Sequence, residues 1–242
     1  MKQPYILISK TIFFPSSGIL AVGDLHLGYE QMLYNEGITL PFDQLKTTKQ
    51  ELEEIINKIN KNNKIKKIIF LGDIKHHFGF EKTEKFELMD FLEFLTRYIP
   101  KENLTMIRGN HDKIEINGIN YKNYYIEDDI AFTHGDKLYP EILDEKIKTI
   151  VISHIHPAVL ISDRIRVKKE KFKCFLIGKF KKKDLIIVPS FLPLILGAEI
   201  NENYSNKPGF SIVSQKQIKE FKTYVIGEDN KVYEFKKYKD LL

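Results

Sequence analysis

Short apolar runs in this chain are followed at once by segments that carry aspartate, asparagine or histidine. The clearest run, Ile68–Leu71, has the pattern of a short buried strand and is followed by Gly72 and Asp73. Open α/β sheets bind their ligands beyond the carboxyl ends of their strands, which is where Asp73 would lie. All seven histidines lie in such segments, at positions 26, 76, 77, 111, 134, 154 and 156. The pattern predicts an α/β fold with a polar site at the C-terminal ends of its strands.

The rest of the chain predicts strands interrupted by a few helices. Apolar runs indicate strands over residues 5–8, 11–14, 19–22, 68–71, 104–107, 130–133 and 149–152. Apolar residues at helical spacing predict one helix over 42–61 and another over about 83–98, and a short helix is expected near 140–147. Beyond residue 158 we expect only short strand-like runs separated by turns.

Length and composition favour one globular domain over residues 1–242. The single cysteine, Cys174, excludes a disulfide framework within the chain and is expected to be a small core residue. The most apolar segment, 185–198, is too short to span a bilayer and contains two prolines. Since the N-terminus also lacks the apolar stretch of a signal peptide, we expect a cytoplasmic protein with no membrane segment.

Seven of the strand-end residues carry the donor atoms of a metal centre. The candidate ligands are Asp24, His26, Asp73, Asn110, His134, His154 and His156. Imidazole and carboxylate groups together suit Mn²⁺, Fe or Zn²⁺. Because Asn110 is neutral, the centre would keep a positive charge toward an anionic substrate.

The order of these residues resembles the signature of the calcineurin-like metallophosphoesterase superfamily, D-x-H, G-D, G-N-H-D/E, H and G-H-x-H. The matching blocks are Asp24-x-His26, Gly72-Asp73, Gly109–Asp112, His134 and His154-x-His156. Ser153 stands where the superfamily usually has glycine, a departure that concerns the geometry of that turn. The segments Gly23–Glu30, Gly72–His76 and Pro189–Leu194 are also similar to the prokaryotic ICC-like, DNA-ligase-associated branch.

This resemblance implies an αββα fold, in which two sheets pack face to face and helices lie outside them. It also implies two divalent ions, with Mn²⁺ expected and Fe, Zn or Ni as alternatives. The implied ligands of one ion are Asp24, His26 and His156, those of the other are Asn110, His134 and His154, and Asp73 would bridge both. His111 would be the catalytic histidine, and Asp112 would orient it and favour its protonated form.

The function implied by the resemblance is hydrolysis of a phosphoester by a hydroxide that bridges the two ions. The branch favours a phosphodiester as substrate. The alternatives are a phosphomonoesterase, a nucleic-acid-processing component that acts with a ligase or helicase, and a scaffold of the same fold without turnover. The complete ligand set argues against the scaffold. No feature of the sequence indicates an oligomeric state.

Five further residues near the ligand blocks have two interpretations each. Lys75 could meet a phosphate group or be solvated, and Arg108 could pair with substrate or form an internal salt bridge. His76 and His77 could contact substrate or support a ligand, or could simply cap a loop. Asp136 could orient His134 or have no such role.

The segment 164–183 is rich in basic residues. Only four of the 38 basic residues in the chain are arginine, so 34 are lysine, and the net charge is +5. The segment could follow a nucleic-acid backbone electrostatically. In a lysine-rich chain it could equally be a charged hairpin that protects the edge of a sheet.

Overall fold

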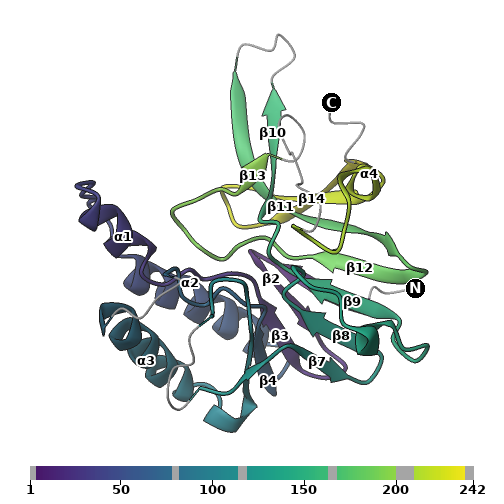
Figure 1. Ribbon diagram of the computed structural model, residues 1–242, viewed down its shortest axis with the longest axis horizontal. Coiled ribbons are helices and arrows are strands. Elements are labelled where there is room, and N and C mark those ends of the chain that lie inside the picture. The colour runs from purple at the N-terminus through teal and green to yellow at the C-terminus, as the bar shows by residue number, and fades with distance from the viewer. Residues whose placement is uncertain (1–3, 78–81, 114–118, 163–167, 200–209, 238–242) are drawn as a thin grey trace.

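The strands of the first half of the chain form a six-stranded sheet. The computed structural model describes residues 4–77, 82–113, 119–162, 168–199 and 210–237, and Figure 1 shows their arrangement. The strands, in sheet order, are β1 (Ile6–Ile8), β2 (Thr11–Phe14), β3 (Ile19–Val22), β4 (Lys67–Phe70), β5 (Leu104–Ile107) and β6 (Tyr121–Lys122). β1, β2 and β3 pair antiparallel, whereas β3, β4, β5 and β6 run parallel.

A second sheet contains the later strands. Its main order is β13-β10-β11-β12-β9-β8-β7, and β14 pairs with β11 and with β15. The bounds are β7 (Tyr124–Glu127), β8 (Ile130–Thr133), β9 (Thr149–Ile152), β10 (Pro157–Ser162), β11 (Lys169–Phe180), β12 (Lys183–Ile187), β13 (Ala198–Glu199), β14 (Lys222–Ile226) and β15 (Val232–Lys237). β8, β9 and β12 run parallel to one another, so both sheets present the carboxyl ends of parallel strands.

Two long helices lie outside the first sheet (Figure 1). They are α2 (Gln44–Asn60) and α3 (Lys82–Thr96). The carboxylate of Asp43 accepts a hydrogen bond of 2.8 Å from the main-chain N–H of Lys46, which caps the start of α2. The shorter helices are α1 (Tyr29–Asn35) and α4 (Gln215–Ile218), with 3₁₀ turns at Lys101–Asn103 and Pro140–Leu143.

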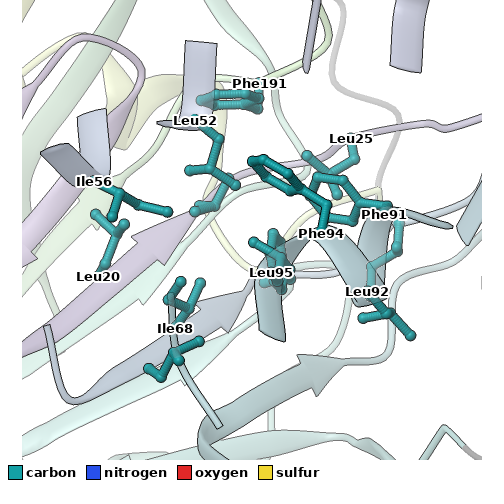
Figure 2. Packing of buried hydrophobic residues seen from close by; sticks show 14 of the residues in the cluster. Leu20, Leu25, Leu52, Ile56, Ile68, Phe91, Leu92, Phe94, Leu95 and Phe191 are labelled. Carbon is teal, nitrogen blue, oxygen red and sulfur yellow. The ribbon is translucent and has the colours of Figure 1, made fainter. Parts of the chain in front are cut away.

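Alternation along the strands divides the core into layers. Successive side chains of a strand point to opposite faces of its sheet. Ile12 and Ile69 therefore join the layer between the two sheets, where Phe132 and Val151 meet them from the second sheet. Leu20 and Ile68 point the other way and pack under α2 and α3 against Leu52, Phe91 and Leu95, as Figure 2 shows. The expected two-sheet α/β sandwich with outer helices is confirmed.

The structure corrects the sequence predictions in three places. The helix expected near 140–147 is a single 3₁₀ turn, Pro140–Leu143, because the side chain of Asp144 accepts a hydrogen bond from the N–H of Lys146 and begins a turn instead. Helix α1 was not predicted, and none of its residues is buried. The region after residue 158 contains a strand of 12 residues, β11, rather than only short runs.

The described part of the basic segment belongs mainly to β11. Its first residues, Lys169–Lys173, pair with β10 in a hairpin, whereas Cys174–Ile177 pair with β14 and Leu176–Phe180 pair with β12. Several of its lysines are paired, for example Lys171 with Glu199 at 3.1 Å and Lys179 with Asp184 at 2.6 Å. Arg164 and Arg166 lie outside the described residues. Within the residues that are described, no helix is long and apolar enough to cross a membrane.

Candidate metal centre

The candidate ligands follow five parallel strands from the two sheets. Asp24 and His26 follow β3, Asp73 follows β4, and Asn110 follows β5. The second sheet contributes the three remaining histidines, His134 after β8 and His154 and His156 after β9. The loops are hydrogen-bonded to one another, since the N–H of His26 donates to the main-chain oxygen of Asp73 at 2.9 Å and the N–H of Ser153 donates to that of His134 at 3.0 Å. All seven side chains therefore lie in one region at the strand ends.

The backbone of this region adopts uncommon conformations. His26, Asp73, His154 and His156 have φ angles between 45° and 65°, the left-handed region that non-glycine residues seldom occupy. Four such residues among seven candidate ligands concentrate backbone strain at one place, as functional sites often do. Gly109 is also required, because a Cβ atom there would lie 2.2 Å from the main-chain nitrogen of Asp73.

One group of ligand atoms comes from Asp24, His26 and His156, and these atoms lie within 4.8 Å of one another. The Nε2 atoms of His26 and His156 are 3.4 Å apart, and the Nε2 atom of His156 is 3.3 Å from Oδ2 of Asp24. We call this set the open group, because 22% of the His156 side chain is exposed. Its spacing suits three ligands around one cation.

A second group comes from Asp73, His134 and His154, again within 4.8 Å. We call it the deep group, since all three residues are buried. The Nε2 atom of His134 lies 3.4 Å from Oδ2 of Asp73, 3.0 Å from Nδ1 of His154 and 3.1 Å from Oδ1 of Asn110. Asn110, which was expected to belong to this set, does adjoin it.

Main-chain oxygens orient the two imidazoles of the deep group. Nδ1 of His134 is 2.8 Å from the oxygen of Leu71, and Nε2 of His154 is 2.7 Å from the oxygen of Phe210. A carbonyl can only accept, so each of these nitrogens carries the proton. When the ring is neutral, its other nitrogen presents a lone pair to the group, as metal-binding histidines do.

The charges of the centre fit a bound cation. Oδ1 of Asp24 is buried and has no hydrogen-bond partner among the described residues. Burial opposes ionisation of Asp24, but His156, His134 and His26 hold its pKa below the ordinary value. Burial would likewise lower the pKa of His134, yet Asp73 and Asp24 raise it to about 10. The two buried carboxylates thus stabilise a proton on the His134 ring, and a metal ion can take the place of that proton.

A third group unites His26, His76 and His111. Nδ1 of His76 lies 3.4 Å from Nδ1 of His26, and its Nε2 lies 3.2 Å from the sulfur of Met32 in α1. Burial and the neighbouring His111 lower the pKa of His76 to about 4. His76 therefore contacts the ring of a candidate ligand, His26. Met32 was missed because the sequence did not predict α1.

His111 is oriented by a group that the sequence did not indicate. Its Nδ1 lies 2.6 Å from the main-chain oxygen of His76, and its main-chain N–H donates to Oδ1 of Asp73 at 2.8 Å. The His111 and His26 rings meet edge to face with centroids 4.9 Å apart. His111 thus adjoins the open group with its Nε2 atom turned away from the His76 oxygen.

The carboxylate of Asp112 points into the protein and was expected to orient His111. It accepts hydrogen bonds from the N–H groups of Gly109 at 3.0 Å and of Ile74 and Lys75 at 3.4 Å. Burial and the nearby Asp73 raise its pKa to about 6. Asp112 therefore joins the loop after β4 to the loop after β5, and the orienting contact of the His111 ring comes from His76.

The other predicted residues fall into distinct environments. Lys75 is 2% exposed and donates to the main-chain oxygen of His77, so it is not a solvated lysine. His77 itself is exposed. Arg108 donates to the main-chain oxygen of Asp112 at 3.3 Å, and its guanidinium lies over the ring of Tyr121. Asp136 is half-buried and is one of the charges that raise the pKa of His134.

Ser153 holds Asp24, a contact that the sequence did not predict. Its hydroxyl donates to Oδ2 of Asp24, and the N–H of His154 donates to the same oxygen at 3.2 Å. The only signal in the sequence was that Ser153 replaces the usual glycine of the H-x-H block. A glycine could not supply this hydroxyl, so the serine adds an anchor to a candidate ligand.

Comparisons with known proteins agree with this geometry. Residues 18–216 match the family model described as calcineurin-like phosphoesterase. The solved structure of the Pseudomonas putida nuclease MPE is similar, with 17% identity, a TM-score of 0.60, and coverage of 96% of this chain and 94% of that chain. A structure described as a novel archaeal phosphodiesterase has 12% identity and a TM-score of 0.40, covering 90% of this chain and 98% of that chain. No curated protein matches. Because the family model covers most of the chain, including every candidate ligand, the chain belongs to the calcineurin-like phosphoesterase family.

Proposed function

We propose that this chain hydrolyses phosphodiesters with the help of two divalent metal ions. The observation that supports this most is that Asp73, a member of the deep group, also approaches His26 of the open group. Its Oδ2 atom lies 3.9 Å from Nε2 of His26 and 3.4 Å from Nε2 of His134. A carboxylate that reaches both groups can serve as a common ligand of two neighbouring ions.

Apart from Asp73, which is shared, the proposed ligands divide as the two groups do, and Asn110 is added to the deep group. Asp24, His26 and His156 would hold one ion, His134, His154 and Asn110 would hold the other, and Asp73 would serve both. When bound, such ions lower the pKa of a coordinated water and neutralise charge on the phosphoryl oxygens. The mixture of imidazole and oxygen ligands favours Mn²⁺, with Fe, Zn or Ni as alternatives.

The protein itself contributes proton transfer and charge. The contact with the main-chain oxygen of His76 keeps a proton on Nδ1 of His111, so Nε2 is the ring nitrogen that would act on substrate. Protonated at Nε2, His111 would donate a proton to the leaving oxygen, or a hydrogen bond to a phosphoryl oxygen. Asn110 adds an oxygen ligand without adding negative charge, which favours the approach of an anionic substrate.

The test is metal-dependent hydrolysis of a generic aryl phosphodiester. Protein stripped with a chelator would be refilled with Mn²⁺ and assayed on the diester and on the matching monoester in parallel. We expect no turnover without metal and faster turnover of the diester with it. Faster turnover of the monoester would overturn the proposed substrate class but keep the metal-dependent hydrolase. Bound Mn²⁺ with no turnover of either ester would favour the scaffold interpretation.

Nucleic acid is a second candidate for the diester. The similar Pseudomonas putida structure is described as a nuclease, and this chain covers nearly all of it. The β10–β11 hairpin projects beyond the other strands of the second sheet (Figure 1), and Lys169 and Lys171 lie on it. Binding to single- or double-stranded DNA that weakens steeply with salt would support this candidate. Binding that does not depend on salt would argue for a small-molecule diester.

A further inference from the structure

A buried lysine, Lys173, lies near the middle of β11 and outside the two ligand groups. Only 7% of its surface is exposed. Its Nζ atom donates hydrogen bonds to the main-chain oxygens of Ser190 at 2.7 Å and Leu192 at 2.5 Å. Burial and the nearby charge of Lys10 lower the pKa of Lys173 well below 10.5. Burying an ammonium group costs free energy unless hydrogen-bond acceptors satisfy it. The two acceptors of Lys173 both belong to one segment, residues 190–192.

Lys10 holds the same segment at its centre. Its Nζ atom donates to the main-chain oxygen of Phe191 at 3.1 Å and lies 4.5 Å from the centroid of the Phe191 ring. It also pairs with the carboxylate of Glu51 in α2. The ring of Phe191 is fully buried and packs beside Leu52 (Figure 2). Two ammonium groups therefore bind the three consecutive oxygens of residues 190–192.

The segment 190–192 is in turn bound to Asp24. The main-chain oxygen of Asp24 accepts hydrogen bonds from the N–H of Phe191 at 2.9 Å and the N–H of Leu192 at 3.1 Å. It also accepts one of 3.1 Å from the hydroxyl of Ser190. Three donors from three successive residues thus converge on one carbonyl group, that of a proposed metal ligand.

The two sides of Asp24 are therefore held by different parts of the chain. Ser153 and His154 bind its carboxylate from the loop after β9, whereas the segment 190–192 binds its carbonyl. Two residues after Asp24, the backbone of His26 has a φ angle of 46°. A main chain that turns so sharply needs an anchor, and residues 190–192 provide one at the first residue of the turn.

We propose that Lys173 is a positioning residue for the open group of the metal centre. By binding the oxygens of Ser190 and Leu192, it fixes the segment 190–192, and this segment fixes the main chain of Asp24 so that its carboxylate faces His156. This inference rests on the proposed function, which makes Asp24 a metal ligand. It assigns to β11 a part in metal binding although no residue of β11 touches the metal centre.

The test is to replace the ammonium group and measure the binding of each metal ion. Lys173→Met keeps a long side chain but removes both hydrogen bonds. Mn²⁺ binding would be followed by electron paramagnetic resonance on chelator-stripped protein. We expect one of two Mn²⁺ ions to bind about 10- to 100-fold more weakly, as when a group that orients a ligand is lost, and the other to bind within about twofold of its original affinity.

Lys171→Met is the matched control, since it removes a lysine two residues along the same strand that pairs with Glu199. It should bind both ions as the unaltered protein does. If Lys173 had only a structural role, Lys173→Met would lower the melting temperature of the metal-free protein and would change both Mn²⁺ affinities equally or change neither. An equal change in both affinities, or no change in either, would overturn the inference.

A second variant covers the case in which Lys173→Met does not fold. Ser190→Ala leaves the lysines in place and removes one of the three bonds to the Asp24 carbonyl. It should weaken the same single ion, by a smaller factor, and unchanged affinity for both ions would overturn the inference. If the unaltered protein binds two ions and cleaves the diester while both variants match it, only this inference fails. If the unaltered protein binds no Mn²⁺, the proposed function fails with it.

Discussion

The open group and the deep group have similar ligands but different surroundings. Both contain one aspartate and two histidines within 4.8 Å. In the deep group His134 has no exposed surface and His154 is 8% exposed, whereas in the open group 22% of the His156 side chain is exposed. The rings of the deep group are fixed by main-chain oxygens. In the open group the partners of the His26 ring are other histidines, His76 and His156.

Because of this difference in burial and in ring partners, we expect the two groups to contribute differently to stability and to chemistry. The ligands of the deep group are part of the core, so their loss disturbs the fold as well as the metal. The open group is exposed to solvent at His156, and His111 lies beside it. We therefore expect the two groups to respond differently to mutation, pH and chelation.

The largest contrast is expected between His134→Ala and His156→Ala. Each removes a proposed ligand, so each should lower phosphodiester turnover by about 10³-fold, equivalent to about 4 kcal/mol. Only His134→Ala should also lower the free energy of unfolding of the metal-free protein, by about 3–5 kcal/mol, because it removes the imidazole that pairs with the buried carboxylate of Asp73. Turnover assays and urea unfolding measure the two effects. An equal loss of stability in both variants would contradict the proposed difference between the deep group and the open group.

The next effect concerns Asp112, which lies beneath the deep group. Its folded-state pKa is raised from 3.8 to about 6 by burial and by Asp73. The folded state therefore binds this proton more tightly, and the stability it contributes is complete below pH 3.8 and lost as pH rises through 6. The loss corresponds to about 3 kcal/mol.

Asp112→Asn should remove this pH-dependent contribution to stability. Urea unfolding of the metal-free protein between pH 4 and 7 would measure it, and the free energy of unfolding should fall less steeply with pH in the variant. Parallel curves for the variant and the unaltered protein would show that burial and the charge of Asp73 do not raise the pKa of Asp112.

A smaller contrast is expected in the release of metal. Because the deep group is buried, its ion should leave a chelator-treated protein about tenfold more slowly than the ion of the open group. Stopped-flow detection of Mn²⁺ release by a chromogenic chelator would show two phases. His156→Ala should abolish the fast phase and keep the slow one, and a single phase in the unaltered protein would contradict the division into two groups.

The smallest effect on metal binding is expected from Cys174→Ala. Cys174 is fully buried on β11, next to Lys173, and burial raises the pKa of its thiol. Removing the sulfur should lower stability by about 1 kcal/mol through a small cavity but leave both Mn²⁺ affinities within twofold. A selective loss of one ion would mean that any disturbance of β11 reaches the centre, and that the comparison of Lys173 with Lys171 needs another control.

Local patterns predicted much of the fold. The strand preceding Asp73 and the helix over 42–61 were found within about two residues, because apolar runs and helical spacing are properties of adjacent residues. Helix α1 was missed since it has no buried face to leave a pattern in the sequence. β11 was not recognised as a long strand because its alternation is masked by lysines, one of which, Lys173, points into the protein.

The sequence by itself determined which residues lie at the strand ends and in what order, because a short apolar strand followed by a polar turn depends on neighbours along the chain. Only the tertiary structure decided which of these side chains face one another, that the His76 oxygen orients His111, and that Asp112 joins two loops. It also decided that Lys10 and Lys173 bind the segment behind Asp24. These contacts join residues up to 181 positions apart, and a hydrogen bond between distant residues depends on the packing of the sheets rather than on any local pattern.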